Sequence, residues 1–214
     1  MRDRSVAQFN LRALFAVISW IAMLLAIAVS SLSAWLMTVL GFSVTTMNCA
    51  GKLTALQTPG NHRRAALLGW LLLLTSLALP AVRGCGNEAV PGYRAAAVAV
   101  LYQVHPPVDQ PVETWAPAYI EFSLLNLANL LVIVAPLFIH RVQRGQGQVY
   151  RGLLAIAASA MWCMPLSEKP GSLLAGYYVW CLAPLCLLAS LRLRWWALAP
   201  MAALAVVRWI WLGR

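Results

Sequence analysis

Acidic residues are scarce in this chain, and charged residues of either sign are uncommon. The 214 residues include six Asp and Glu, and charged residues make up 10% of the total. Soluble domains carry about 25% charged residues, so this composition is far from theirs. Hydrophobic residues account for 62%, and the mean hydropathy is +0.74. We therefore expect an integral membrane protein that forms a single membrane domain over residues 1–214, because the longest stretch between apolar runs, 83–117, leaves no room for a soluble domain.

The common sequence signatures of enzymes and metal sites are also missing. The chain contains no H-E-x-x-H, G-x-S-x-G, P-loop or C-x-x-C motif. Its histidines, His62, His105 and His140, are isolated in predicted loops and do not have the spacing of metal ligands. We expect no catalytic residues, no metal and no cofactor. The alternative is an enzyme whose site residues are scattered along the chain, and no sequence feature supports it.

The cysteines do not indicate a disulfide framework. Their number is odd, and four of the five lie in or at the edge of apolar runs: Cys49, Cys163, Cys181 and Cys186. Cys181 and Cys186 are about 140° apart around a helix, so they would not chelate one ion together. Cys85 lies in a connecting segment, and a predicted span separates it from Cys49.

Apolar runs of membrane length predict an all-α integral membrane fold with five to six transmembrane helices and one short re-entrant or interfacial helix. We expect the short helix at 95–104, because ten residues of helix reach about 15 Å, half the thickness of the hydrocarbon. Pro59 and Gly60 predict a turn before the second span, and Pro80 predicts its end. The apolar segments are, in order, 13–40, 65–82, 118–139, 152–166, 173–191 and 195–212.

The first apolar run, 13–40, follows a basic tail. It is about twice as long as the hydrophobic region of a secretory signal, so we expect an uncleaved anchor; cleavage near the small residues 31–34 is the less favoured alternative. Small side chains recur every four residues in this run and predict a ridge for close helix packing: Ala22, Ala26, Ser30 and Ala34. The alternative is that Ala and Ser are simply common in membrane helices.

The stretch 118–139 carries polar residues inside an apolar run of membrane length. Around a helix, Glu121, Asn126, Asn129 and Pro136 fall within an arc of about 140°, and large apolar side chains occupy the rest. Lipid cannot solvate an amide or a carboxyl group, so this arc should face other helices or a water-filled cavity. Glu121, Asn126 and Asn129 are therefore the candidate polar face within the membrane.

Two interpretations of this face stay open. In one, Glu121 is a carboxylate that couples the movement of protons or cations, with Asn126 and Asn129 as neutral ligands deeper in the span. In the other, which we favour, Glu121 reaches the interface while the asparagines bond neighbouring helices.

Two prolines inside predicted spans free backbone carbonyl groups, because proline has no amide hydrogen. Pro136 frees the carbonyl of Val132, and Pro184 frees that of Trp180. Such kinks can form a solute pocket, although prolines are also common in membrane helices that have none.

The formal net charge of +10 does not indicate nucleic-acid binding, because the 16 Lys and Arg residues stand in short groups between apolar runs. Membrane orientation explains these groups better. Six simple crossings put eight Lys and Arg residues on each side of the membrane. If 13–50 enters the bilayer and returns, these residues divide eleven to five between the two sides. If 95–104 crosses the bilayer, they divide ten to six. We favour the orientation in which the acidic, proline-rich connector is outside and the cytoplasmic loops are 51–64, 140–151 and 192–194.

One pattern in the sequence consists of Ser76-Leu77-Ala78-Leu79-Pro80-Ala81, Gly84, Pro91-Gly92-Tyr93-Arg94-Ala95 and Leu127-Ala128-Asn129. This pattern covers about a third of the chain and resembles that of small multi-spanning bacterial membrane proteins of unassigned function. Because that group has no established activity, the resemblance implies no site residues.

The functional expectation is a non-enzymatic membrane subunit or scaffold in a bacterial inner membrane. It is based on the short loops, the small-residue ridge and the lack of a dense polar constellation. The alternative is a transporter of ions or small solutes that uses the face of Glu121, Asn126 and Asn129. The expected partners are the lipid bilayer and other membrane subunits or a second copy; nucleic acid is not expected.

Overall fold

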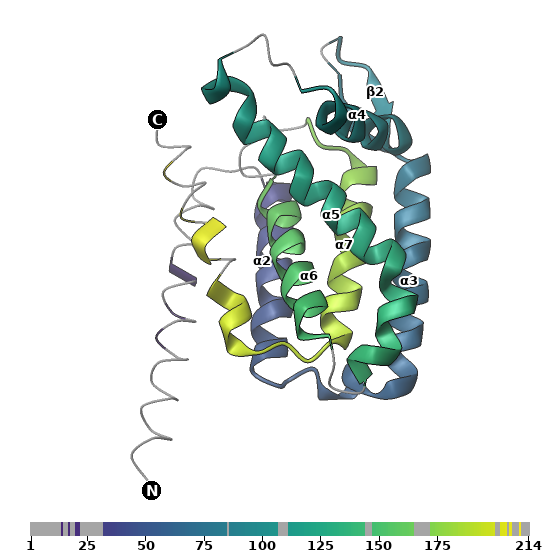
Figure 1. The fold of residues 1–214 in the computed structure, drawn as a ribbon, viewed down its shortest axis with the longest axis vertical. Helices are drawn as coiled ribbons and strands as arrows, with labels where there is room; N and C mark the ends of the chain where they lie inside the picture. Colours follow the sequence, from purple (N-terminus) through teal and green to yellow (C-terminus); the bar gives the residue numbers. More distant parts are fainter. Residues whose placement is uncertain are drawn as a thin grey trace, which may run out of the picture.

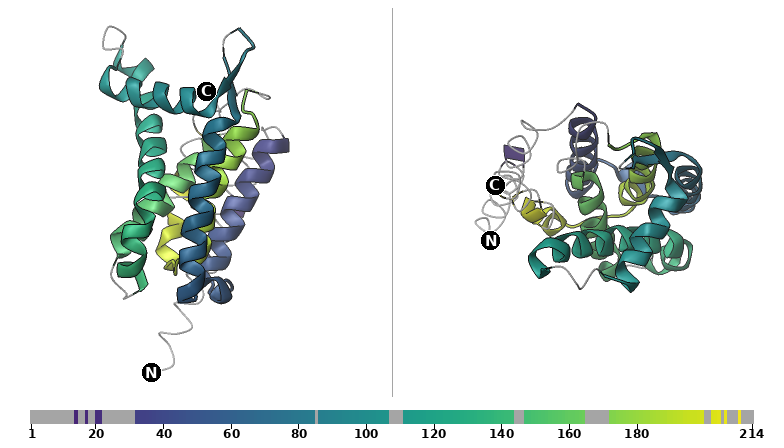
Figure 2. Two further views of the ribbon diagram at one scale, coloured as in Figure 1. Left: turned by 90° about the vertical axis from the view of Figure 1, so that its right-hand side faces the viewer. Right: turned by 90° about the horizontal axis from the view of Figure 1, so that it is seen from above.

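The computed structural model describes residues 14, 17, 20, 21, 32–84, 86–106, 111–143, 147–164, 172–199, 202–204, 206 and 210. Over these residues the chain is mostly helical, as the composition predicts. The longer helices are α2 (Leu32–Cys49), α3 (Pro59–Ala78), α4 (Gly92–Val104), α5 (Val112–Gln143), α6 (Gln148–Cys163) and α7 (Ala175–Ser190). Figures 1 and 2 show α2, α3, α5, α6 and α7 side by side as a bundle, with α4 lying across one end.

A small hairpin adjoins α4 at that end of the bundle. Strands β1 (Pro80–Arg83) and β2 (Ala89–Pro91) pair antiparallel. The segment before α7 adds to the edge of β1, since Arg83 N donates to Ser172 O and Leu174 N donates to Ala81 O, both at 2.8 Å. Two short 3-10 turns, η1 (Thr54–Gln57) and η3 (Trp195–Ala197), belong to the connections at the opposite end.

Helix α3 differs from the predicted second span at both ends. It begins at Pro59, so the prediction of a turn at Pro59 and Gly60 is wrong. Proline is suited to the first helical position, where its missing amide hydrogen has no partner to lose. The helix ends at Ala78 and Pro80 begins a strand, so the predicted stop at Pro80 is confirmed, but residues 80–82 are not helical.

Helix α2 continues to Cys49, past Leu40, where the first apolar segment was expected to end. Thr38, Thr45 and Asn48 are buried polar residues of α2 whose side chains donate to backbone carbonyls, so they are satisfied without leaving the helix. Thr38 donates to the carbonyl of Trp162 at 3.0 Å and Thr45 to that of Gly41 at 3.1 Å.

Trp20, in the first apolar run, and Phe42, in α2, do not lie on one continuous helix. The rings of Trp20 and Phe42 pack edge to face, with centroids 4.8 Å apart. On a single helix, 22 positions would separate these residues by about 33 Å. Three residues of the predicted packing ridge, Ala22, Ala26 and Ser30, lie outside the described residues, and Ala34 lies in α2.

The remaining segments match their expected positions with shifted ends. Helix α5 contains all of 118–139, and α4 contains 95–104. Helices α6 and α7 have 16 residues each, about 24 Å in length. The last expected segment, 195–212, begins with η3 and is described only in part.

Within the described part of the chain, one helix is both long and apolar enough to cross a membrane. It is Ala118–Ile139, which has a mean hydropathy of 2.2 and is 33% buried. The apolar stretches Leu36–Cys49 and Ala175–Ser190 are shorter.

The core lies around α6 and α7. Leu154, Met161, Leu187 and Leu188 are fully buried, and so is the large ring of Trp162. A β carbon at Gly41 of α2 would overlap the Trp162 ring. The close approach of α2 to α6 therefore depends on glycine at this position.

Candidate functional site

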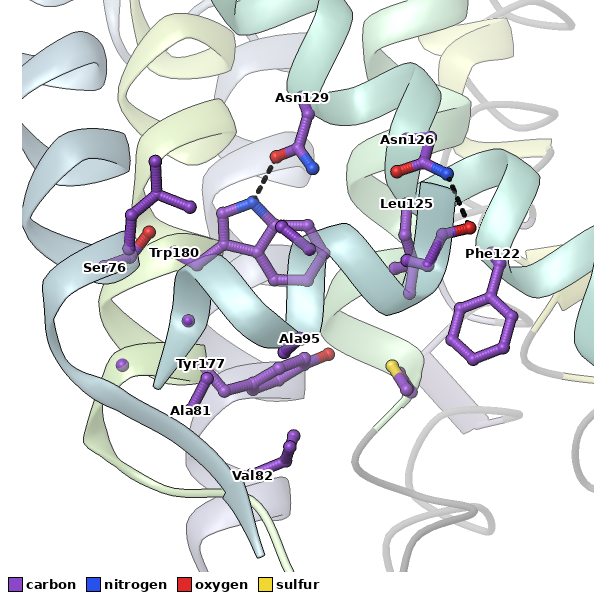
Figure 3. Close-up of a pocket in the computed structure, with 16 residues that line it drawn as sticks. Ser76, Ala81, Val82, Ala95, Phe122, Leu125, Asn126, Asn129, Tyr177 and Trp180 are labelled. Atoms are coloured by element: carbon purple, nitrogen blue, oxygen red, sulfur yellow. Dashed lines mark hydrogen bonds between the residues drawn. The ribbon is translucent and has the colours of Figure 1, made fainter. Parts of the chain in front are cut away.

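A cavity of about 100 Å³ lies where α4 and the hairpin meet α3, α5 and α7, and it is partly open. Figure 3 shows the residues that line it. The described residues that line it include no Asp, Glu, Lys, Arg or His. They are Ser76, Leu77, Ala81, Val82, Gly92, Ala95, Ala96, Ala99, Phe122, Leu125, Asn126, Asn129, Met164, Gly176, Tyr177 and Trp180. Two residues of the candidate polar face, Asn126 and Asn129, are among them.

Asn129 joins α5 to α7. Its Oδ1 atom accepts a hydrogen bond from the indole Nε1 of Trp180 at 2.5 Å (Figure 3). An indole N–H donates only, so this bond fixes the amide with its oxygen toward Trp180.

Asn126 joins α5 to α4. Its Nδ2 atom donates to the Ala99 carbonyl at 3.2 Å and to Gln103 Oε1 at 2.9 Å. A backbone carbonyl accepts only, so the orientation of this amide is fixed as well. The network continues as Gln103 Nε2 donates to Ser123 Oγ at 2.7 Å, and Ser123 Oγ donates to the Tyr119 carbonyl at 2.8 Å.

Glu121 does not line the cavity, although it lies on the same helix and is half-buried. Five positions along a helix rotate a side chain by about 140°, so Glu121 and Asn126 stand at opposite edges of the predicted arc. The structure therefore brings the two asparagines together without the carboxylate. Pro136 is exposed and lies on a separate groove between α3 and α5.

The carbonyl of Val132, which Pro136 frees, accepts a hydrogen bond from another helix. Trp70 of α3 donates its indole Nε1–H to the carbonyl of Val132 at 2.9 Å. The predicted freeing of this carbonyl is confirmed by its use in helix packing.

Aromatic rings form one wall of the cavity. Tyr177 and Trp180 pack edge to face with centroids 5.5 Å apart. The Tyr177 hydroxyl donates to the carbonyl of Met161, and Ser76 Oγ donates to that of Leu73 at 2.6 Å. These two hydroxyl groups therefore already donate within the protein.

The most fully bonded polar side chain lies elsewhere and was not among the predicted site residues. Asn48 is 2% exposed. Its Nδ2 donates to the carbonyls of Leu188 and Leu191, and its Oδ1 accepts from Leu193 N and Gln57 Nε2, both at 3.1 Å. A signal was present in the sequence, because Thr38, Thr45 and Asn48 recur at helical spacing within an apolar run.

Basic groups gather at the end of the bundle opposite α4. The described residues of the loops 51–64, 140–151 and 192–194 all lie there, and the sequences of these loops contain no acidic residue. Arg151 Nη1 donates to the carbonyl of Arg192 at 3.1 Å. Burial lowers the pKa of Arg151, and the charges of Arg192 and Arg194 lower it further. Burial likewise lowers the pKa of His62, with a smaller contribution from the charge of Arg151.

Among the described residues, no group of three or more His, Cys, Asp or Glu side chains is placed to hold a metal ion. Cys49, Cys163, Cys181 and Cys186 are free thiols. The chain matches no family model, no curated protein and no solved structure.

Proposed function

We propose that this chain is a multi-pass helical membrane protein that serves as a non-enzymatic subunit or scaffold of a bacterial inner membrane. One observation carries the membrane assignment: large apolar side chains are exposed on several helices of the bundle. They include Leu36 and Leu40 of α2, Leu67, Leu71 and Leu74 of α3, and Ile120, Leu130, Ile133 and Leu137 of α5. Leu67 is 62% exposed and Leu137 74%. Soluble proteins rarely leave large contiguous apolar surfaces exposed, whereas hydrocarbon solvates them.

The contact of Trp20 with Phe42 supports the topology in which 13–50 enters the bilayer and returns. With that topology, Lys and Arg divide eleven to five. The richer group contains the three loops at the basic end of the bundle, and these loops face the cytoplasm by the positive-inside rule. The hairpin and α4 then lie at the outer surface, with α4 along the interface.

Helices α6 and α7 are shorter than the hydrocarbon, which is about 30 Å thick. This length is compatible with a membrane location if the backbone beyond their ends is bonded within the protein. Leu174 N and the Ser172 carbonyl, before α7, bond to β1. After α7, Leu193 N donates to the side chain of Asn48.

The scaffold role is supported by how the intramembrane polar groups are used. Asn129, Asn126 and Trp70 each bond a group on a different helix. Such bonds hold helices together in lipid, where a polar group has no water. These contacts favour the structural interpretation of the asparagines over ion ligation.

A transporter of small neutral solutes is the second candidate, because Asn126 and Asn129 line a cavity. Ions are a poorer match than neutral solutes, since the described lining residues carry no charge and a buried ion needs a paired charge.

Two measurements test these proposals. Washing membranes at alkaline pH should leave an integral protein in the lipid fraction, and its release into the wash would reject the membrane assignment. Purified protein in liposomes should give ion flux equal to that of empty liposomes, for the parent and for Glu121→Gln. Flux that Glu121→Gln abolishes without loss of folding would replace the scaffold with a coupled transporter.

A further inference from the structure

Each of the two asparagines that line the cavity has one side-chain atom that makes no hydrogen bond to a described residue. Trp180 uses the oxygen of Asn129, and Ala99 and Gln103 use the nitrogen of Asn126. The Nδ2 donor of Asn129 and the Oδ1 acceptor of Asn126 then remain, and no described residue bonds to either. In Figure 3 these two atoms turn toward each other.

This arrangement is fixed by the protein before any ligand enters. Each amide is oriented by a partner with one hydrogen-bonding role, an indole N–H for Asn129 and a backbone carbonyl for Asn126. The asparagines are three positions apart on α5, so their side chains are neighbours on one face. The cavity thus offers one donor and one acceptor side by side.

The rest of the wall is apolar or aromatic. Phe122, Leu125, Tyr177 and Trp180 surround the cavity, and small side chains on α4 leave the space open. A cavity of about 100 Å³ is of the order of size that holds one small organic molecule, since an apolar cavity of roughly 150 Å³ in another protein takes up benzene.

We propose that this cavity binds a small neutral molecule that carries one hydroxyl group on an apolar, ring-sized body. The hydroxyl oxygen accepts from Asn129 Nδ2 and its hydrogen is donated to Asn126 Oδ1, while the body packs against Phe122, Tyr177 and Trp180. A charged molecule is excluded because the described residues that line the cavity offer no opposite charge to a buried ion. This binding site goes beyond the scaffold function and does not require transport.

The test uses the full-length protein in lipid nanodiscs and ¹⁹F NMR of 4-fluorophenol, with empty nanodiscs as the reference. We expect saturable binding above the reference. Fluorobenzene, which has no hydroxyl group, should bind at least about tenfold more weakly, the equivalent of two modest hydrogen bonds, one to each amide. 4-Fluoroanisole, which accepts but does not donate, should fall between them.

A matched pair of variants on α4 locates the binding. Ala95 lines the cavity and Ala97, two positions away, is exposed. Ala95→Leu should fill the space and abolish saturable binding, whereas Ala97→Leu should bind as the parent does.

Two results would overturn the proposal. One is uptake of 4-fluorophenol that does not saturate and equals that of empty nanodiscs, as expected for a cavity that holds only water. The other is equal affinity for 4-fluorophenol and fluorobenzene, which would remove the role of the amides. Both are measured on the parent protein, so they hold even if Ala95→Leu fails to fold.

Discussion

At the scale of single residues, polar side chains act here mainly as connectors between helices. Asn48 bonds the end of α7, Trp70 bonds α5, and Asn129 bonds Trp180 of α7. Each connector supplies a partner to a group that would otherwise be buried without one. Leaving such a group unpaired costs about 1–3 kcal/mol, so these positions should respond strongly to substitution.

Asn48→Ala should be the most destabilising of these changes. It leaves the carbonyls of Leu188 and Leu191 and the amide of Leu193 without this partner, so we expect a loss of about 3 kcal/mol or more. Unfolding in mixed micelles, followed by circular dichroism, measures the loss. Asn61→Ala is the control, since it removes one exposed bond to Ala55 and should cost under about 1 kcal/mol. Equal costs at both positions would contradict the connector role.

A double-mutant cycle tests the bond between Trp70 and the Val132 carbonyl. Trp70→Phe removes the donor and should cost about 1–2 kcal/mol beyond the change in packing. Pro136→Ala restores an amide hydrogen that can bond this carbonyl within α5. Trp70→Phe should therefore cost less in the Pro136→Ala background, and a coupling energy of zero would show that the two groups do not share the carbonyl.

His62 should make stability depend on pH. Its pKa in the folded protein lies below the ordinary value of 6.5, chiefly because of burial. Below pH 6.5, His62 is therefore protonated more readily in the unfolded chain than in the folded one. The free energy of unfolding should fall as the pH falls through this region. His62→Gln should flatten the stability curve between pH 7 and 5, and an unchanged slope in this variant would assign the pH dependence to other groups.

At the scale of elements, apolar run length predicted where helices form better than where they end. The run 118–139 lies wholly within α5, which includes Pro117 and extends beyond both ends of the run, and 95–104 lies within α4. The end of α2 could not be predicted in the same way. Polar residues near the end of an apolar run indicate a loop when their partners are unknown, and the backbone partners of Asn48 lie more than 100 positions further along the chain.

The candidate site was predictable only in the part contributed by one helix. The helical arc identified Asn126 and Asn129, because their spacing alone places them on one face. Trp180, Tyr177 and the α4 residues reach the cavity through tertiary packing, which no local pattern encodes. Glu121 shares the predicted arc with the asparagines, but it stands about 140° from Asn126 around the helix, so the two side chains face different neighbours.

Packing between α2 and α6 yields a prediction at the same scale. Gly41→Ala places a methyl group against the ring of Trp162, and overpacking of this kind costs about 1–3 kcal/mol. Gly60→Ala is the matched control, since a β carbon there meets open space near the start of α3. The thermal midpoint in detergent should fall for Gly41→Ala only. A parent-like midpoint for Gly41→Ala would show that α2 does not approach α6 as closely as the structure has it.

At the scale of the whole molecule, charge distinguishes the two ends of the bundle. The loops 51–64, 140–151 and 192–194 come from distant parts of the sequence and contain no acidic residue, and their described residues meet at one end. The connector that carries Glu88 leads to α4 at the other end. A helical bundle with one basic end is the charge distribution that the positive-inside rule associates with a fixed orientation in the membrane.

This polarity predicts which end an impermeant thiol reagent reaches in intact cells. In a background with Cys85→Ser, a cysteine at Glu88 should be labelled from outside, because Glu88 is exposed on the hairpin. A cysteine at Lys52, exposed at the basic end, should be labelled only after the membrane is permeabilised. Labelling at Lys52 with protection at Glu88 would invert the orientation. Equal labelling at both positions in intact cells would contradict the membrane assignment itself, since no bilayer would then separate the two ends.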